Sequence, residues 1–190
     1  MLTIRKAKIQ DARLLSQLLE TSYRFYFSEL WNNKDELKTY ISEESSIENI
    51  VASLETPDHH WFIAESHQDI NVAATGHDII PGNIIGFSKI VLNQLIPDKD
   101  FTGIYLHKLY LTPHLTGKKY GDQLFDHIVA FGQERGQKWL WLEVLEKNPK
   151  AIRFYARKGM EWQKDIIFSS ETQQSTMHIM AKNLSLIKME

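Results

Sequence analysis

The chain has 190 residues, a length that suits one domain with a sizeable hydrophobic core. Hydrophobic residues make up 43%, charged residues 24%, and the formal net charge is −2, so nothing global favours nucleic acid or an anionic membrane. The absence of cysteine excludes disulfides, thiol nucleophiles and thiolate metal sites. No stretch has the apolar length of a signal peptide or a membrane span, so we expect a soluble cytoplasmic protein.

The order of the predicted elements indicates a mixed α/β sheet in one domain, residues 1–190. Hydrophobic patterning predicts strands at residues 2–6, 61–65, 84–92, 139–145, 160–169 and 176–184, and a further strand from Gly103 that Pro113 ends. Helix starts are predicted at Asp11, at Asn33 with Glu36, at Ser45 with Glu48 (the capping-box spacing) and at Asn148 before Pro149. Residues 67–83 and 94–102 are polar and predict loops.

The turn after the strand that Pro113 ends carries the clearest binding pattern. It comprises Thr116, Gly117, Lys118, Lys119, Tyr120 and Gly121, and an amphipathic helix follows directly. Such a helix start aims backbone N–H groups and a positive dipole end at one point, which favours an anion. Two lysines oppose the helix dipole unless an anion lies between them, so we predict a pyrophosphate site. The alternative is a solvated, lysine-rich helix start.

These motifs resemble the GNAT superfamily of acetyl-CoA-dependent N-acetyltransferases. The resemblance rests on the strand exit Tyr110-Leu111-x-Pro113, the Gly117…Gly121 turn and the run Asn148-x-x-Ala151-x-x-Phe154-Tyr155-x-x-x-Gly159. It covers essentially the whole chain and implies an α/β GNAT fold: a single domain with a mixed, mostly antiparallel sheet of about seven strands, splayed between strands four and five and flanked by helices. The last third most resembles bacterial PaiA-type spermidine/spermine acetyltransferases.

The turn departs from the family pattern at two signature positions. The family usually has Gln/Arg-x-x-Gly-x-Gly/Ala, whereas this chain has Thr116, Lys119 and Gly121. A glycine at position 119 would let phosphate approach the backbone without a Cβ. Lys119 still offers its backbone N–H and adds an ammonium. We therefore expect binding of the cosubstrate acetyl-CoA to be weakened or reshaped rather than lost.

The resemblance also implies contacts to acetyl-CoA outside the turn. The backbones of Leu109 and Leu111, with Tyr110 between them, are expected to contact the acetyl and pantetheine groups. Asn148 is expected near the pantetheine arm, although its place before a proline also makes it a helix N-cap, and capping alone would explain it.

The implied reaction is direct attack of an amine on the acetyl thioester in a ternary complex. The departing thiolate needs a proton, and Tyr155 stands where the family places its general acid. The alternative for Tyr155 is a core position, because Ala151, Ile152 and Tyr155 lie at helical spacing.

The sequence does not decide which group is the general base. Family members commonly place a glutamate on the fourth strand, where this chain has His107, with Tyr105 on the same face. A neutral imidazole can accept a proton directly or through water, and the alternative is a partly exposed strand histidine. Glu143 on the fifth strand is a rival, either as the base or as the carboxylate that holds a cationic acceptor, and a water chain is a further alternative.

Of all parts of the expected reaction, the acceptor of the acetyl group is the one that the sequence determines least. The resemblance favours a small-molecule amine, a polyamine or similar primary amine, and the carboxylates between residues 29 and 44 suit a polycation, although solvated helix faces explain them equally. A protein N-terminus or lysine is the rival acceptor, and a non-catalytic acetyl-CoA-binding regulatory module is a third hypothesis. No metal is expected, because the pair His59-His60 lacks a following ligand at zinc-like spacing. Many relatives dimerise, so a homodimer is one possible assembly.

Overall fold

The strands of the protein form one sheet in the order β1-β2-β3-β4-β5-β7-β6. The computed structural model describes residues 2–67 and 81–185. The strands are β1 (Leu2–Lys6), β2 (His59–Ser66), β3 (Ile84–Leu95), β4 (Thr102–Leu111), β5 (Trp139–Leu145), β6 (Glu161–Ser169) and β7 (Gln174–Asn183). β4 runs parallel to β5, whereas β1–β2, β5–β7 and β6–β7 are antiparallel. The expected mixed, mostly antiparallel sheet is confirmed.

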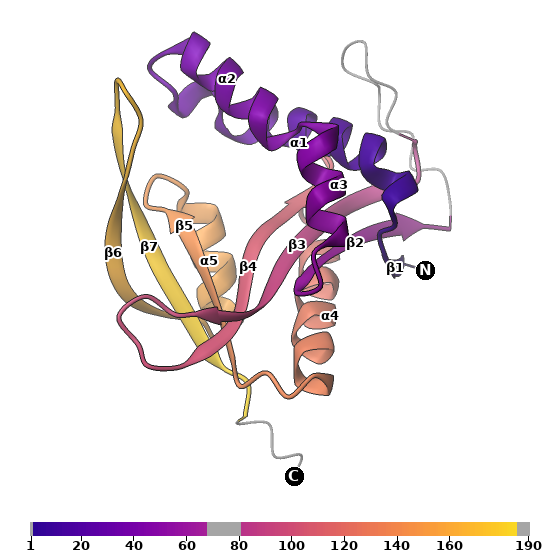
Figure 1. The fold of residues 1–190 in the computed structure, drawn as a ribbon, viewed down its shortest axis with the longest axis vertical. Coiled ribbons are helices and arrows are strands. Elements are labelled where there is room, and N and C mark those ends of the chain that lie inside the picture. The colour runs from indigo at the N-terminus through magenta and orange to yellow at the C-terminus, as the bar shows by residue number, and fades with distance from the viewer. Residues whose placement is uncertain (1, 68–80, 186–190) are drawn as a thin grey trace. The chain divides into compact units, whose positions relative to one another are not determined.

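Helices flank this sheet, as Figure 1 shows. The α-helices are α1 (Ala12–Phe27), α2 (Lys34–Glu44), α3 (Ile47–Glu55), α4 (Tyr120–Glu134) and α5 (Pro149–Arg157), with short 3-10 turns η1 (Ile9–Asp11) and η2 (Ser28–Leu30). The chain packs as two compact units: unit 1 is Met1–Lys89 with Lys108–Phe125, and unit 2 is Ile90–His107 with Asp126–Glu190. No helix in the described ranges is long and apolar enough to cross a membrane.

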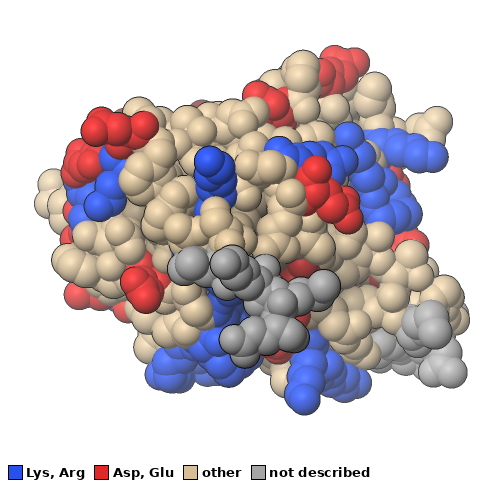
Figure 2. All heavy atoms as spheres, turned by 90° about the horizontal axis from the view of Figure 1, so that it is seen from below, with Lys and Arg blue, Asp and Glu red and all other residues tan. Residues whose placement is uncertain are grey.

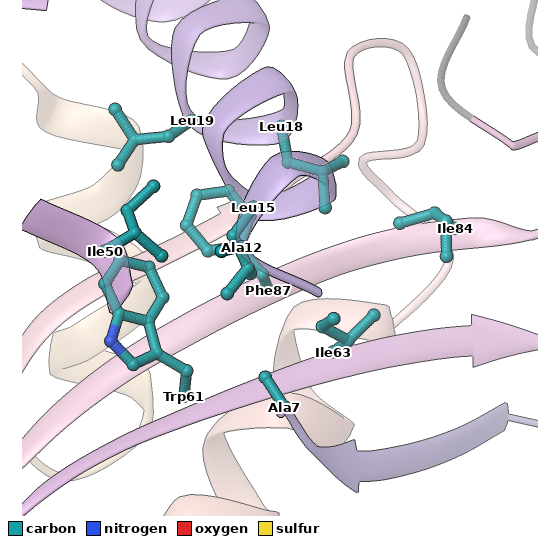
Figure 3. Close-up of a cluster of buried hydrophobic side chains, with 10 residues drawn as sticks. All are labelled: Ala7, Ala12, Leu15, Leu18, Leu19, Ile50, Trp61, Ile63, Ile84 and Phe87. Carbon is teal, nitrogen blue, oxygen red and sulfur yellow. The ribbon is translucent and has the colours of Figure 1, made fainter. Parts of the chain in front are cut away.

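The core of unit 1 attaches α1 and α3 to β2 and β3. Leu15, Leu18 and Leu19 follow helical spacing and are at most 1% exposed, and they pack in one cluster with Trp61 and Phe87 (Figure 3). Full burial of such a side chain stabilises the fold by roughly 1.5–3 kcal/mol. The Trp61 indole N–H, which would be costly to bury without a partner, donates to Ser53 Oγ over 2.9 Å.

The core of unit 2 lies on one face of β5 and β7. Trp141, Ile179 and Ala181 are buried there together with Ile96, and Tyr105 packs against them. In the β5–β7 register Trp141 pairs with Ala181 and Glu143 with Ile179. Since side chains two residues apart share a face of a strand, Glu143 emerges on the same face as Trp141.

Two predicted helix caps were wrong. The cap of α3 is Ser46, whose side chain accepts from the Asn49 N–H, whereas Ser45 closes α2 by donating its hydroxyl to the Ile41 carbonyl. Asp11 precedes α1 but does not cap it, because its carboxylate binds the Arg5 guanidinium at 2.8 and 2.9 Å. The predicted caps at Asn33 and Asn148 are confirmed.

The third strand is longer than predicted, reaching Leu95 instead of residue 92. Asn93 adopts a left-handed φ of 57° within it. The amide side chain of Gln137 accepts from the Asn93 N–H at 3.4 Å and donates to Asn93 Oδ1 at 2.8 Å, which supports this irregular point from a distant segment. The loop predicted at residues 67–83 falls mostly outside the described residues.

Candidate active site

Four side chains of unit 2 meet across the parallel pair β4–β5. Two residue pairs form this ladder, Ile104 with Leu140 and Tyr105 with Trp141. The rings of Tyr105 and Trp141 stack with centroids 4.3 Å apart, and the His107 ring lies 5.3 Å from the Tyr105 ring. Glu143 shares the face of Trp141 and hydrogen-bonds to Tyr105. We call Tyr105, His107, Trp141 and Glu143 the carboxylate–aromatic cluster.

Glu143 is a titratable group of this cluster with a shifted pKa. Its side chain is partly buried, and burial raises its pKa above the ordinary carboxyl value, while the hydrogen bond from the Tyr105 hydroxyl acts in the opposite direction. A carboxylate with a raised pKa accepts protons closer to neutral pH than an exposed one does. Glu143 was a rival base at the level of sequence, and the contact with Tyr105 gives it a fixed position.

Tyr155 lies on α5, a helix whose start is well defined. The Asn148 side chain accepts from the Ala151 N–H over 3.2 Å, and Pro149 occupies the first turn. Burial raises the pKa of the Tyr155 hydroxyl, so this group stays protonated at neutral pH and can donate. Asn148 therefore caps the helix that carries the predicted general acid, and both lie in unit 2 with His107.

The predicted pyrophosphate turn lies in unit 1 and is exposed from Thr116 to Lys119. Gly117 has a φ of 88° and Lys119 a φ of 59°. The Gln123 N–H donates to the Lys119 carbonyl over 3.2 Å, so α4 begins directly after the turn. Lys119 thus adopts the left-handed conformation that glycine favours, at a cost of roughly 1–2 kcal/mol.

This turn fits an anionic group. A Cβ at Gly117 would meet nothing within 4 Å, so the surface at this point is open. Helix geometry leaves the first N–H groups of α4 without intrahelical acceptors, and two lysine side chains stand beside them. These are the features that a pyrophosphate needs.

The end of β4 is held by a residue that sequence reasoning missed. Leu109, Tyr110 and Leu111 are partly buried, and the Tyr26 hydroxyl on α1 donates to the Leu111 carbonyl over 3.1 Å. On the β3 side, a Cβ at Gly86 would lie 2.3 Å from the Tyr110 carbonyl oxygen, so only glycine allows this close approach. No local signal could have paired Tyr26 with a strand 85 residues away.

Basic side chains are scattered on the face drawn in Figure 2, where Lys and Arg form separate groups with Asp and Glu among them. A groove that follows a nucleic-acid backbone needs a continuous positive surface, which this face does not offer. Within residues 2–67 and 81–185, no three His, Cys, Asp or Glu side chains are placed to hold a metal ion.

The chain belongs to the GNAT family of acetyltransferases. A family model described as "Acetyltransferase (GNAT) family" matches residues 16–160, which confirms the family expected from the motifs. A similar sequence is an uncharacterised N-acetyltransferase of Lactobacillus delbrueckii subsp. lactis, 27% identical over 110 residues that cover 55% of this chain and 61% of the relative. The chain therefore spans less than two thirds of that curated relative.

Solved structures share the fold. The PaiA N-acetyltransferase from Thermoplasma acidophilum, in complex with coenzyme A, is 20% identical with a TM-score of 0.71, covering 96% of this chain and 99% of that one. Mutant forms of the spermidine/spermine N-acetyltransferase SpeG from Vibrio cholerae are 18% identical with a TM-score of 0.62, covering 97% and 96%. These likenesses confirm the expected α/β GNAT fold with its seven-stranded sheet.

Proposed function

We propose that this chain transfers the acetyl group of acetyl-CoA to a primary amine, and that the amine is a polyamine such as spermidine or spermine. The carboxylate–aromatic cluster carries the proposal, because it combines a carboxylate of raised pKa with stacked aromatic rings. The polyamine is supported by the PaiA-type motifs of the last third and by the spermidine/spermine acceptor named for the Vibrio relative.

The carboxylate–aromatic cluster suits an alkylammonium group. The stacked rings of Tyr105 and Trp141 cover each other's faces, so the partly buried carboxylate of Glu143 supplies the charged acceptor for the ammonium group. A polyamine remains cationic at its distal nitrogens, so the negative charge of Glu143 favours its approach. A neutral acceptor such as an alcohol would gain neither interaction.

The reaction requires two proton movements that residues of unit 2 can perform. Glu143 accepts a proton from the acceptor ammonium, and the neutral amine then attacks the thioester; burial raises the pKa of Glu143, and Tyr105 holds its carboxylate. His107, on the same face as Tyr105, is the alternative base. The Tyr155 hydroxyl donates its proton to the departing thiolate, since burial keeps it protonated.

Acetyl-CoA, when bound, supplies the activated acetyl group. In this proposal the turn Thr116–Gly121 holds the pyrophosphate, while Asn148 and the backbones from Leu109 to Leu111 hold the pantetheine arm and the acetyl group. Lys119 supplies a positive charge where the family usually has glycine, which compensates for the Cβ that it adds.

The test is release of free thiol from acetyl-CoA in the presence of spermidine, spermine, diamines, lysine-terminated peptides or amino sugars. Saturable turnover of the polyamines is the expected result. Turnover of peptides alone would replace the acceptor but keep the reaction. Coenzyme A binding without turnover of any amine would contradict the enzymatic proposal and favour a regulatory module, which the altered turn at Lys119 would permit.

A further inference from the structure

Unit 1 contains a pair of lysines, Lys89 on β3 and Lys108 on β4, that have no role in the proposed reaction. The Lys108 side chain on β4 is only 7% exposed, and its ammonium lies 2.6 Å from Glu44 on α2. Lys89 on β3 is partly buried, with its ammonium 5.3 Å from the ring centroid of Trp61. Buried lysines are rare unless they are paired, so two of them together need a physical explanation. We call Glu44, Lys89 and Lys108 the lysine cluster.

The lysine cluster carries one positive charge in excess. Lys89 and Lys108 each contribute +1 and Glu44 contributes −1, so the sum is +1. Glu44 interacts electrostatically with both ammonium groups, but it is in contact with Lys108. Within the described part of the chain, no ion pair or hydrogen bond joins Lys89 to an acidic side chain, and its contact there is the Trp61 ring.

The titratable groups that interact with Lys89 or lie near Glu44 do not supply the missing negative charge. His59 on β2 has its own pKa lowered by burial and by Lys89, so it stays neutral at neutral pH. Tyr23 on α1 and Tyr40 on α2 have raised pKa values because of burial, so both hydroxyls stay protonated. Tyr110 on β4 adds a further phenol near Tyr40. Lys89 thus lies against an aromatic ring, and the phenols near Glu44 are uncharged.

We propose that the lysine cluster is a binding site for a monocarboxylate with a small hydrocarbon part. One carboxylate neutralises the excess charge, whereas a phosphate dianion would reverse it. The Trp61 ring offers apolar contact to a short alkyl chain. Access lies on the side of Glu44, whose side chain is 32% exposed.

When no ligand is bound, the surroundings of Lys89 disfavour its charged form. Burial, and then the charge of Lys108, lower the pKa of Lys89 to about 8. A bound carboxylate favours the charged form of Lys89 and so raises this pKa again. Binding should therefore be strong near pH 7 and weaken as the pH rises above 8, where Lys89 loses its proton.

The test is thermal unfolding of the full chain without acetyl-CoA, in increasing propionate or butyrate at constant ionic strength. Propionamide is the matched neutral control, since it has the same shape without the charge. We expect saturable stabilisation by the two carboxylates at pH 7 that falls at pH 9.5. Equal effects of propionate and propionamide on the wild type would overturn the proposal.

Three variants locate the site. Lys89→Met removes the charge and keeps the apolar stem, so it should fold and bind propionate at least tenfold more weakly. Lys89→Arg keeps the charge and should retain most of the binding. Lys38→Met removes an exposed lysine of α2 and should behave as the wild type. Unchanged propionate binding in Lys89→Met would overturn the assignment.

The carboxylate has two potential sources, a free metabolite or the acceptor itself, and a kinetic comparison separates them. Free lysine and cadaverine differ only by the carboxylate. If the acceptor supplies it, Lys89→Met raises KM for lysine and leaves KM for cadaverine unchanged. If a free acid supplies it, both KM values stay unchanged while the propionate effect on unfolding is lost. The unfolding test does not depend on turnover, so failure of the proposed transferase activity would leave it intact.

Discussion

Tyr105 on β4 and Trp141 on β5 are direct partners in the parallel ladder, and their rings stack with centroids 4.3 Å apart and planes 24° apart. The stack fixes the phenol of Tyr105, whose hydroxyl then reaches Glu143 two residues beyond Trp141. In the proposed function, this carboxylate on β5 is the general base.

Replacing Glu143 tests this arrangement. Glu143→Gln keeps the shape and the Tyr105 contact but cannot take a proton, so kcat/KM for the amine should fall by roughly 10²–10⁴. In the wild type, activity should fall as the pH drops through the raised pKa of Glu143, at higher pH than for an ordinary carboxyl group, because only the deprotonated form accepts a proton. The pH–rate profile is the measurement.

His107 provides the comparison for that experiment. His107→Ala should lower the rate modestly and keep the acidic limb of the profile if Glu143 is the base. A limb that disappears in His107→Ala but persists in Glu143→Gln would transfer the role to the histidine. Coenzyme A affinity, measured in parallel, should be the same in both variants.

Tyr155→Phe tests the general acid. Burial keeps the Tyr155 hydroxyl protonated, so its removal should lower kcat by roughly 10²-fold while acetyl-CoA affinity changes little. The loss should be smaller for a thioester whose leaving thiol has a lower pKa, because that thiolate needs its proton less. Turnover at the wild-type rate would show that Tyr155 is a packing residue.

Local patterns predicted most elements but failed where two choices are locally equivalent. Ser45 and Ser46 are adjacent serines, and the capping-box spacing pointed to the first. The structure uses Ser46, because Ser45 still belongs to the end of α2, where its N–H and its hydroxyl both donate to the Ile41 carbonyl. The residue at which α2 ends decides which serine caps α3, and the spacing of residues in the sequence does not show where α2 ends.

The candidate sites also divide into those that local sequence predicts and those that it does not. The turn at 116–121 and the cap at Asn148 depend on neighbouring residues, so their patterns were visible in the sequence. The contact of Lys108 with Glu44 spans 64 positions, and that of Tyr105 with Trp141 depends on strand pairing. Such contacts follow from the sheet, which residue spacing describes only in outline.

Lys119 should be under backbone strain that glycine would relieve. Lys119→Gly should raise the free energy of unfolding by about 0.5–1 kcal/mol, since the gain at a φ of 59° exceeds the entropy that glycine adds to the unfolded chain. Lys118→Gly, whose φ is not positive, is the matched control and should not stabilise the protein. Denaturant unfolding measures both. A coenzyme A affinity that falls in Lys119→Gly would show that the ammonium contacts the pyrophosphate, whereas a rise would show that the Cβ obstructs it.

Asn148 has two expected roles that one pair of variants separates. Asn148→Ala removes the acceptor of the Ala151 N–H and should lower the free energy of unfolding by about 1 kcal/mol. Asn148→Ser restores a capping oxygen and should recover most of that stability. If Asn148 also contacts the pantetheine arm, the serine variant will unfold like the wild type but bind coenzyme A more weakly. Wild-type affinity in Asn148→Ser would leave capping as the complete explanation of this residue, and α5 would then carry Tyr155 as its one group in the proposed reaction.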